Sequence, residues 1–242
     1  MPRFYLDTEF QIGQILSLPA ELAHHIQVLR LQVGAELELF NGRGLSFTAE
    51  LTELGKKQAT VKLLSDSTVN RELAYAITLA QGLPEGSKFD WILEKAVELG
   101  VSRIQPLAAQ RSVVKLHAER VEKKYQHWQG IVISASEQSG RNQLLTLAPV
   151  LSVNNYLQQE HDVVRIMLSP RADLPLSKWL AANPPQALEI MIGPEGGFSA
   201  EEEQLAAQQG VLLCAFGPRI LRTETAGLAV VSAINAHWGG FN

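Results

Sequence analysis

The sequence predicts two domains: a small β-barrel or curled sheet, followed by a larger α/β domain built on a mostly parallel sheet. From Arg3 to about Ser65 the chain consists of short alternating runs broken by turn signals. Apolar runs then alternate with helical stretches, a pattern typical of a parallel sheet covered on both faces. A chain of 242 residues has room for both, because domains commonly have about 100 to 200 residues.

Two successive hairpins are expected in the first part. Three runs, AELELF, LSFTAELTEL and QATVKLL, read as strands and are separated by short polar segments. Gly42 and Gly44 in the first segment, and Gly55 in the second, supply the positive φ angles that tight turns need. A small barrel or curled sheet is the natural closure of such strands.

A short helix and a polar segment complete this part of the chain. Residues 19–29 carry Leu22, Ile26 and Leu29 at helical spacing, which predicts one short helix. The segment 65–73 is polar and has no clear period. We therefore place the domain boundary there.

Helix ends and strands alternate in the second part. The apolar runs YAITLA, VSRIQPL, VVRIML, LEIMIG and VLLCAF are expected to be its strands. Ser87–Asp90 and Ser199–Glu202 have the form of a capping box, and Gly100 and Gly210 stand where a C-terminal helix cap is expected. The final helix, Ala226 to Trp238, carries more apolar residues than one sheet face should need, which predicts a homodimer.

Composition excludes several classes of protein. No run approaches the roughly 20 apolar residues that cross a bilayer, and the first residues lack the order of a signal peptide, so we expect a soluble cytoplasmic protein. The single cysteine, Cys214, lies in an apolar run and is expected in the core. The net charge of −4 is not typical of a nucleic-acid binder. The cations between Arg103 and Lys124 form either a basic patch or a solvated helix face.

Two loops are candidates for a ligand site. Residues 193–199, GPEGGFS, follow one strand and precede a capped helix, where backbone amides can approach a ligand. This loop matches neither the dinucleotide motif nor the P-loop, and a tight connection without a ligand is the alternative. Residues 216–226 also lie between a strand and a helix, with Arg222 and Glu224 either facing a ligand or pairing with each other.

Two further polar segments leave their role open. Glu137 and Arg141, at the end of a helix expected from Ala118, either bind a polar ligand or solvate the helix end. The adjacent His24 and His25 point about 100° apart on a helix and are poor partners for one metal ion. Packing or contact with an RNA backbone is favoured for them, and no metal is expected.

Five segments, in this order along the chain, resemble the 16S ribosomal RNA uridine-N3 methyltransferases: HHIQVLRLQVG, KFDWILEKAVELGV, SEQSGR, MIGPEGGFSAEE and FGPRILRTETA. The resemblance implies a PUA-like RNA-binding barrel over residues 1–70 and a SPOUT-type α/β methyltransferase domain with a deep C-terminal trefoil knot over 73–242. It also implies S-adenosylmethionine as cofactor, a homodimer with a shared active site, and 16S ribosomal RNA or the small ribosomal subunit as partner. The reaction would be methylation of N3 of one specific uridine.

The resemblance also implies a set of site residues. The cofactor would lie among three knot loops, against Leu168, Ser169, Gly193, Pro194, Glu195, Gly196, Gly197, Phe216, Gly217, Ile220, Leu221, Thr225 and Ala226. RNA contacts are expected from Arg3, Arg30, Arg111, Lys115, Arg141 and Arg219. Phe216 stands where leucine is commoner, which should change packing against the adenine more than the identity of the cofactor.

The chemistry of uridine suggests which side chains act. N3 carries a proton and is a poor nucleophile until that proton leaves, so the enzyme must align the base and stabilise its anion. An arginine would repel a sulfonium, so we expect Arg222 or Arg3 to face the RNA. Glu224 or Glu195 is expected to orient the base or accept its proton. Two other functions stay open: a different nucleotide-dependent enzyme that binds phosphate at 193–197, and a non-catalytic RNA-binding module.

Overall fold

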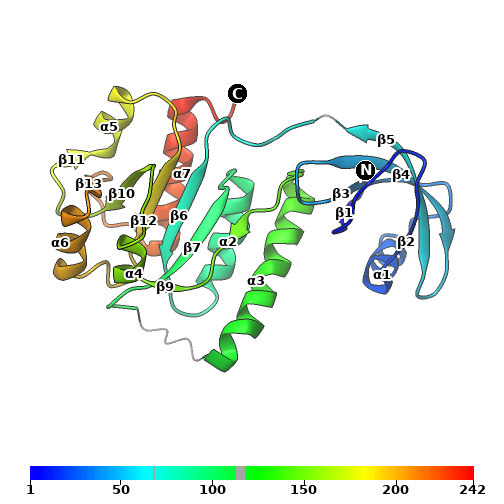
Figure 1. Cartoon of the computed structure of the whole chain (residues 1–242), viewed down its shortest axis with the longest axis horizontal. Helices are drawn as coiled ribbons and strands as arrows, with labels where there is room; N and C mark the ends of the chain where they lie inside the picture. The colour runs from blue at the N-terminus through cyan, green and yellow to red at the C-terminus, as the bar shows by residue number, and fades with distance from the viewer. Residues whose placement is uncertain (68, 113–117) are drawn as a thin grey trace. The chain divides into compact units, whose positions relative to one another are not determined.

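The computed structural model describes residues 1–67, 69–112 and 118–242, and the chain divides into two compact units (Figure 1). Unit 1 consists of Met1–Glu72 and Ser136–Leu144, and unit 2 of Leu73–Ala135 and Leu145–Asn242. The segment Ser136–Leu144 thus belongs to unit 1, although it lies inside the range 73–242. Among the described residues, no helix is long and apolar enough to cross a membrane.

Unit 1 is built on a five-stranded sheet with the order β1-β3-β4-β5-β2. Its elements are β1 (Arg3–Tyr5), β2 (Ile15–Leu18), α1 (Ala20–Val28), β3 (Glu36–Phe40), β4 (Ser46–Leu54) and β5 (Ala59–Ser67). The antiparallel pairs β3–β4 and β4–β5 confirm the two predicted hairpins, and α1 confirms the short helix. Two register shifts in the pairing of β4 with β5 indicate bulges, which bend a strand and help the sheet to curl around its apolar core.

The two hairpin turns differ in their use of glycine. Gly42 and Gly44 have φ angles of 75° and 101°, as predicted. The prediction for Gly55 is wrong, because no positive φ occurs there. Its N–H instead donates to the carbonyl of Gln58 at 2.7 Å, which joins the two ends of the connection between β4 and β5.

Unit 2 contains an eight-stranded sheet in which every pairing between described strands is parallel. The strands are β6 (Ile77–Gly82), β7 (Arg103–Ala108), β8 (Thr146–Leu147), β9 (Leu151–Ser152), β10 (Val164–Leu168), β11 (Leu174–Pro175), β12 (Leu188–Ile192) and β13 (Leu212–Ala215). The order is β11-β13-β10-β12-β6-β7-β8, with β9 pairing with β7. The five apolar runs contain β10, β12 and β13 and most of β6 and β7, so the parallel sheet is confirmed.

Helices cover both faces of this sheet (Figure 1). They are α2 (Lys88–Glu98), α3 (Ala118–Ser139), α4 (Val153–Leu157), α5 (Leu176–Ala182), α6 (Ala200–Gln208) and α7 (Thr223–Trp238). On β6, Leu79 and Gln81 face Gly227 of α7, while Ala80 packs in the cluster that contains residues of α4 and α6. Because side chains alternate along a strand, α7 lies on the opposite face from α4 and α6.

The predicted helix ends are confirmed with one exception. Ser199 and Glu202 form a complete capping box, and Gly100 and Gly210 adopt φ angles of 83° and 77° after their helices. Ser87 makes no side-chain capping bond, so the second capping box is wrong. Its backbone, with φ −95° and ψ 8°, lacks the extended conformation of a capping serine.

The homodimer was predicted from the apolar surface of the final helix, and that reason is wrong. Helix α7 begins at Thr223, earlier than expected, and it packs against β6, β12 and α2 of its own unit. Leu228 is 8% exposed, and Val230, Val231 and Ile234 are fully buried by these contacts. The apolar residues of α7 are therefore accounted for within one chain. Cys214 lies in the core as predicted, and burial raises the pKa of its thiol to about 11.

Candidate active site

Three loops meet where neighbouring strands of unit 2 end. β10 pairs with both β12 and β13, so the segments after these strands lie at one edge of the sheet. They enclose a cavity of about 680 Å³ lined by residues 168–171, 192–198 and 216–224, with Lys88, Arg111, Glu203 and Ala226. The structure thus brings together the three segments expected to share a site. Of the expected cofactor contacts, all but Thr225 line this cavity.

Glycine allows the loop after β12 to pack closely on its neighbours. A Cβ on Gly82, at the end of β6, would lie 2.6 Å from both the ring and the nitrogen of Pro194. A Cβ on Gly193 would lie 2.9 Å from the backbone of Gly197, whose own φ is 66°. Any side chain at Gly82 or Gly193 would therefore displace the loop backbone from the cavity wall.

Glu195 points to a neighbouring loop rather than standing free. Its Oε1 accepts hydrogen bonds from Lys88 Nζ at 2.5 Å and from the N–H of Glu85 at 3.1 Å. Burial by itself raises the pKa of this carboxyl, but the hydrogen bonds from Lys88 and the backbone outweigh it and leave the pKa below its ordinary value. Glu195 is therefore poorly suited to accept a proton, and its contacts suit it to hold the loop.

Arg222 and Glu224 differ in their exposure to solvent and in the surroundings of their charged groups. Arg222 is exposed at the N-terminal end of α7, and both residues line the cavity. No ion pair joins them among the described residues, so the alternative in which they only pair is not seen. Glu224 Oε2 is buried and has no hydrogen-bond partner within the protein. A buried acceptor in this position is available to a ligand.

Sequence reasoning missed an ion pair at the cavity. Arg171 Nη2 lies 2.7 Å from Glu203 Oε1, and its Nε donates to Oε2 at 3.2 Å. Glu203 is 9% exposed, in the first turn of α6. Arg171 lies two positions after Ser169, an expected cofactor contact, which was the one available signal. Another cation at the cavity, Arg111, was expected to contact RNA, and its Nη1 donates to the carbonyl of Gly196 at 3.0 Å.

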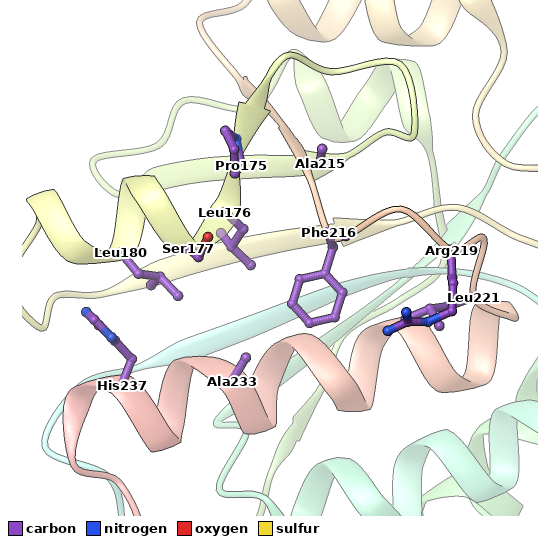
Figure 2. Close-up of a pocket in the computed structure, with 11 residues that line it drawn as sticks. Pro175, Leu176, Ser177, Leu180, Ala215, Phe216, Arg219, Leu221, Ala233 and His237 are labelled. Carbon is purple, nitrogen blue, oxygen red and sulfur yellow. The ribbon is translucent and has the colours of Figure 1, made fainter.

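A second cavity of about 410 Å³ lies beside the first (Figure 2). The two share Phe216, Gly217, Arg219 and Leu221 in their linings. Figure 2 shows the ring of Phe216 pointing toward α7, which contributes Ala233 and His237 to this second lining. The loop 216–221 is therefore a wall between two cavities, and Phe216 packs on the protein side as well as bordering the expected cofactor site.

In unit 1, two arginines expected to contact RNA have internal partners. The Arg3 side chain is 10% exposed and donates to Glu38 Oε1 at 3.1 Å, to Asn142 Oδ1 at 2.8 Å and to the Arg141 carbonyl at 3.2 Å. Burial lowers its pKa. The Arg141 side chain is 4% exposed and pairs with Glu72. These contacts suit residues that stabilise unit 1, so we assign neither arginine to the reaction or to RNA binding.

The remaining predicted residues are less constrained. Arg30 and Arg219 are exposed, and Lys115 lies outside the described residues. His25 packs edge-on against Phe4, with ring centroids 5.2 Å apart, in agreement with a packing role. Glu137 accepts the N–H of Tyr5 at 2.9 Å, and burial raises its pKa. Within the described ranges there is no group of three or more acidic, histidine or cysteine side chains that would hold a metal ion.

Comparison with known proteins identifies both units. Residues 71–235 match the model of the RNA methyltransferase domain, and residues 18–64 match that of the RNA methyltransferase PUA domain. The fold class expected from the resemblance, a PUA domain before an α/β methyltransferase domain, is thereby confirmed.

Relatives match over nearly the full chain. Ribosomal RNA small subunit methyltransferase E of Bacillus subtilis is 35% identical over 97% of this chain and 96% of its own length. The crystal structure of that enzyme from Neisseria gonorrhoeae, bound to S-adenosyl methionine, has a TM-score of 0.92 with 38% identity and covers 98% of each chain. A Legionella pneumophila protein in complex with the cofactor SAM has a TM-score of 0.91, 37% identity, and coverage of 97% of this chain and 96% of its own. This chain belongs to the ribosomal RNA small subunit methyltransferase E family.

Proposed function

We propose that this protein transfers a methyl group from S-adenosylmethionine to N3 of one uridine in the 16S ribosomal RNA of the small subunit. Family membership supports ribosomal RNA methylation, and the cofactor-bound relatives support the choice of cofactor. The observation that carries the proposal is the three-loop cavity, whose lining includes an exposed arginine and a carboxylate with a buried, unpartnered oxygen. The uridine-N3 target rests on the motif resemblance and on the chemistry of these two side chains.

The cavity fits this cofactor in size and chemistry. A volume of about 680 Å³ lies within the usual range of roughly 300 to 1,000 Å³ for small-molecule sites. Leu168, Ile192 and Leu221 offer apolar surface to a purine, and the glycines of 193–197 leave backbone groups open to approach.

Two side chains act on the uridine, one as a proton acceptor and one as a hydrogen-bond donor. The bound cofactor supplies a methyl group that its sulfonium already activates. Glu224 accepts the N3 proton of uracil, and the N3 electron pair then forms the bond to the methyl carbon as the carbon–sulfur bond breaks and its electrons remain on sulfur. Arg222 donates hydrogen bonds to a uracil oxygen, where negative charge develops as the proton leaves. Glu195, held by Lys88, keeps the loop in place.

The decisive experiment uses small subunits from a strain that lacks this protein. Purified protein and cofactor labelled in the methyl group are added, and the modified nucleoside is identified by mass spectrometry against a standard methylated at N3 of uridine. A methyl group on another base or atom contradicts the uridine-N3 target. Calorimetry with S-adenosylmethionine, ATP and NAD tests the alternative that the protein is another nucleotide-dependent enzyme, which would bind ATP or NAD instead. Cofactor binding with no transfer to any RNA would favour the non-catalytic module.

The proposal includes a cytoplasmic homodimer with a PUA-like domain over 1–70 and a knotted methyltransferase domain over 73–242, as the resemblance implies. We expect light scattering to give twice the mass of one 26.6 kDa chain. A monomer at every concentration tested would rule out an active site shared between two chains.

Gly82→Ala tests the close contact beneath the loop 193–197. We expect cofactor affinity to fall roughly ten- to a hundredfold, because the new methyl group would lie 2.6 Å from Pro194 and would displace the loop. Isothermal calorimetry measures the change. The control is Gly130→Ala in α3, where an added Cβ meets nothing within 4 Å. Equal affinity in the Gly82 variant would show that the position of this loop does not matter for binding.

A further inference from the structure

A buried chain of hydrogen bonds links the two main loops of the cavity. Gln81 Nε2, at the end of β6, donates to Thr223 Oγ1 at 2.8 Å. Thr223 Oγ1, at the start of α7, donates to the carbonyl of Gly193 at 2.6 Å. Gln81 is fully buried and Thr223 is 4% exposed. We refer to Gln81, Thr223 and the Gly193 carbonyl as the relay.

The Gly193 carbonyl fixes which group donates in each hydrogen bond of the relay. A carbonyl only accepts, so the single hydroxyl proton of Thr223 must point to Gly193. The hydroxyl oxygen therefore accepts from Gln81, whose amide nitrogen must face it. This orientation leaves Gln81 Oε1 buried without a partner. Nε2 also donates to the carbonyl of Gly82 at 3.0 Å, so two hydrogen bonds, one of them in the relay, fix how this amide is turned.

The surroundings of the relay keep its members in contact. Gly227, one turn along α7 from Thr223, leaves room for the amide, since a Cβ there would lie 3.2 Å from Gln81 Oε1. Gly82, directly after Gln81, packs against Pro194, directly after Gly193. Three chain segments that are distant in sequence are therefore joined at one buried point behind the cavity.

We propose that Gln81 and Thr223 are positioning residues for the cofactor site. The relay holds the loop 193–197 and the first turn of α7 in the relative arrangement that binds the cofactor. Arg222 and Glu224 flank Thr223 in sequence, so the same hydrogen bonds also orient the two side chains assigned to the reaction. This inference rests on the proposed function for its ligand, but the relay itself joins the loops whether or not a ligand is bound.

Three variants separate the effect of the relay's hydrogen bonds from the effect of side-chain size. Thr223→Val keeps the shape of the side chain and removes the hydroxyl, whereas Thr223→Ser keeps the hydroxyl. Gln81→Glu keeps the size of the amide, but an ionised carboxylate only accepts, so it draws the Thr223 proton away from Gly193. We expect Thr223→Val and Gln81→Glu each to weaken S-adenosylmethionine binding roughly tenfold, and Thr223→Ser to change it little.

Two measurements on the intact protein test whether the relay positions the cofactor site. Calorimetry gives cofactor affinity, and hydrogen exchange without ligand reports the amides of 193–197 and 222–226. The relay predicts faster exchange in both loops for Thr223→Val and wild-type exchange for Thr223→Ser. Unchanged exchange in the valine variant would overturn it, as would a lower melting temperature with unaltered affinity of the folded protein. If the wild type binds no S-adenosylmethionine but the valine variant still loosens both loops, the proposed function fails and the relay stands.

Discussion

Arg222→Ala should reduce methyl transfer roughly a hundred- to a thousandfold while leaving S-adenosylmethionine affinity nearly unchanged. Arg222 is exposed at the cavity and has no ion pair with Glu224, so its charge is available to the RNA. A guanidinium suits a phosphate or the developing uracil anion and does not suit a sulfonium. The rate should be measured in a single turnover with saturating cofactor, and affinity by calorimetry.

Arg219→Ala is the matched comparison for that experiment. Arg219 lies in the same loop and lines the same cavity. If it acts only by attracting RNA, its replacement weakens RNA binding and leaves the single-turnover rate at saturating RNA unchanged. Parallel losses of rate and cofactor affinity in Arg222→Ala would instead assign Arg222 to the shape of the loop.

Glu224→Gln should have the second large effect, a fall in rate of roughly a hundred- to ten-thousandfold. The amide has the same shape as the carboxyl but cannot take the N3 proton. Its oxygen still accepts one hydrogen bond, so cofactor affinity should fall much less than the rate. Glu94→Gln on α2 serves as the control, since the Glu94 side chain is 47% exposed, pairs with its neighbour Lys95 and does not line the cavity. A rate equal to that of the wild type would exclude Glu224 as the proton acceptor.

Much of the methyltransferase fold follows from local patterns. The runs that become β6, β7, β10, β12 and β13 are apolar because both faces of the sheet are covered, and the box at Ser199 is a short-range motif. Ser87 has the same motif but a different backbone, which spacing alone does not reveal. The ends of parallel strands also indicated the cavity, because neighbouring strands bring their following loops together.

The interactions that were missed join residues far apart in sequence. Arg3 and Asn142 are 139 positions apart, and Gln81 and Thr223 are 142 apart. Hydrophobic periodicity reports which face of an element is buried and says nothing of such partners. An arginine that binds RNA and one that binds a buried carboxylate look alike in the sequence. Arg3 and Arg141 were therefore assigned to RNA, whereas the structure pairs them inside unit 1.

The segment Ser136–Leu144 bears on the order in which the chain folds during synthesis. Unit 1 consists mainly of the first 72 residues, but it is incomplete until the ribosome has released the chain beyond Leu144. Until then the Arg3 guanidinium lacks Asn142 and the Arg141 carbonyl, and Glu72 lacks Arg141. In a nascent chain of about 100 residues Arg3 would thus keep its hydrogen bond to Glu38, but the sheet would lack the contacts that Arg3 and Glu72 make with residues 141 and 142 in the intact protein. Folding of the N-terminal unit is expected to wait for a stretch of chain encoded well downstream, and a fragment that ends at residue 72 should be less stable than the same unit in the intact protein.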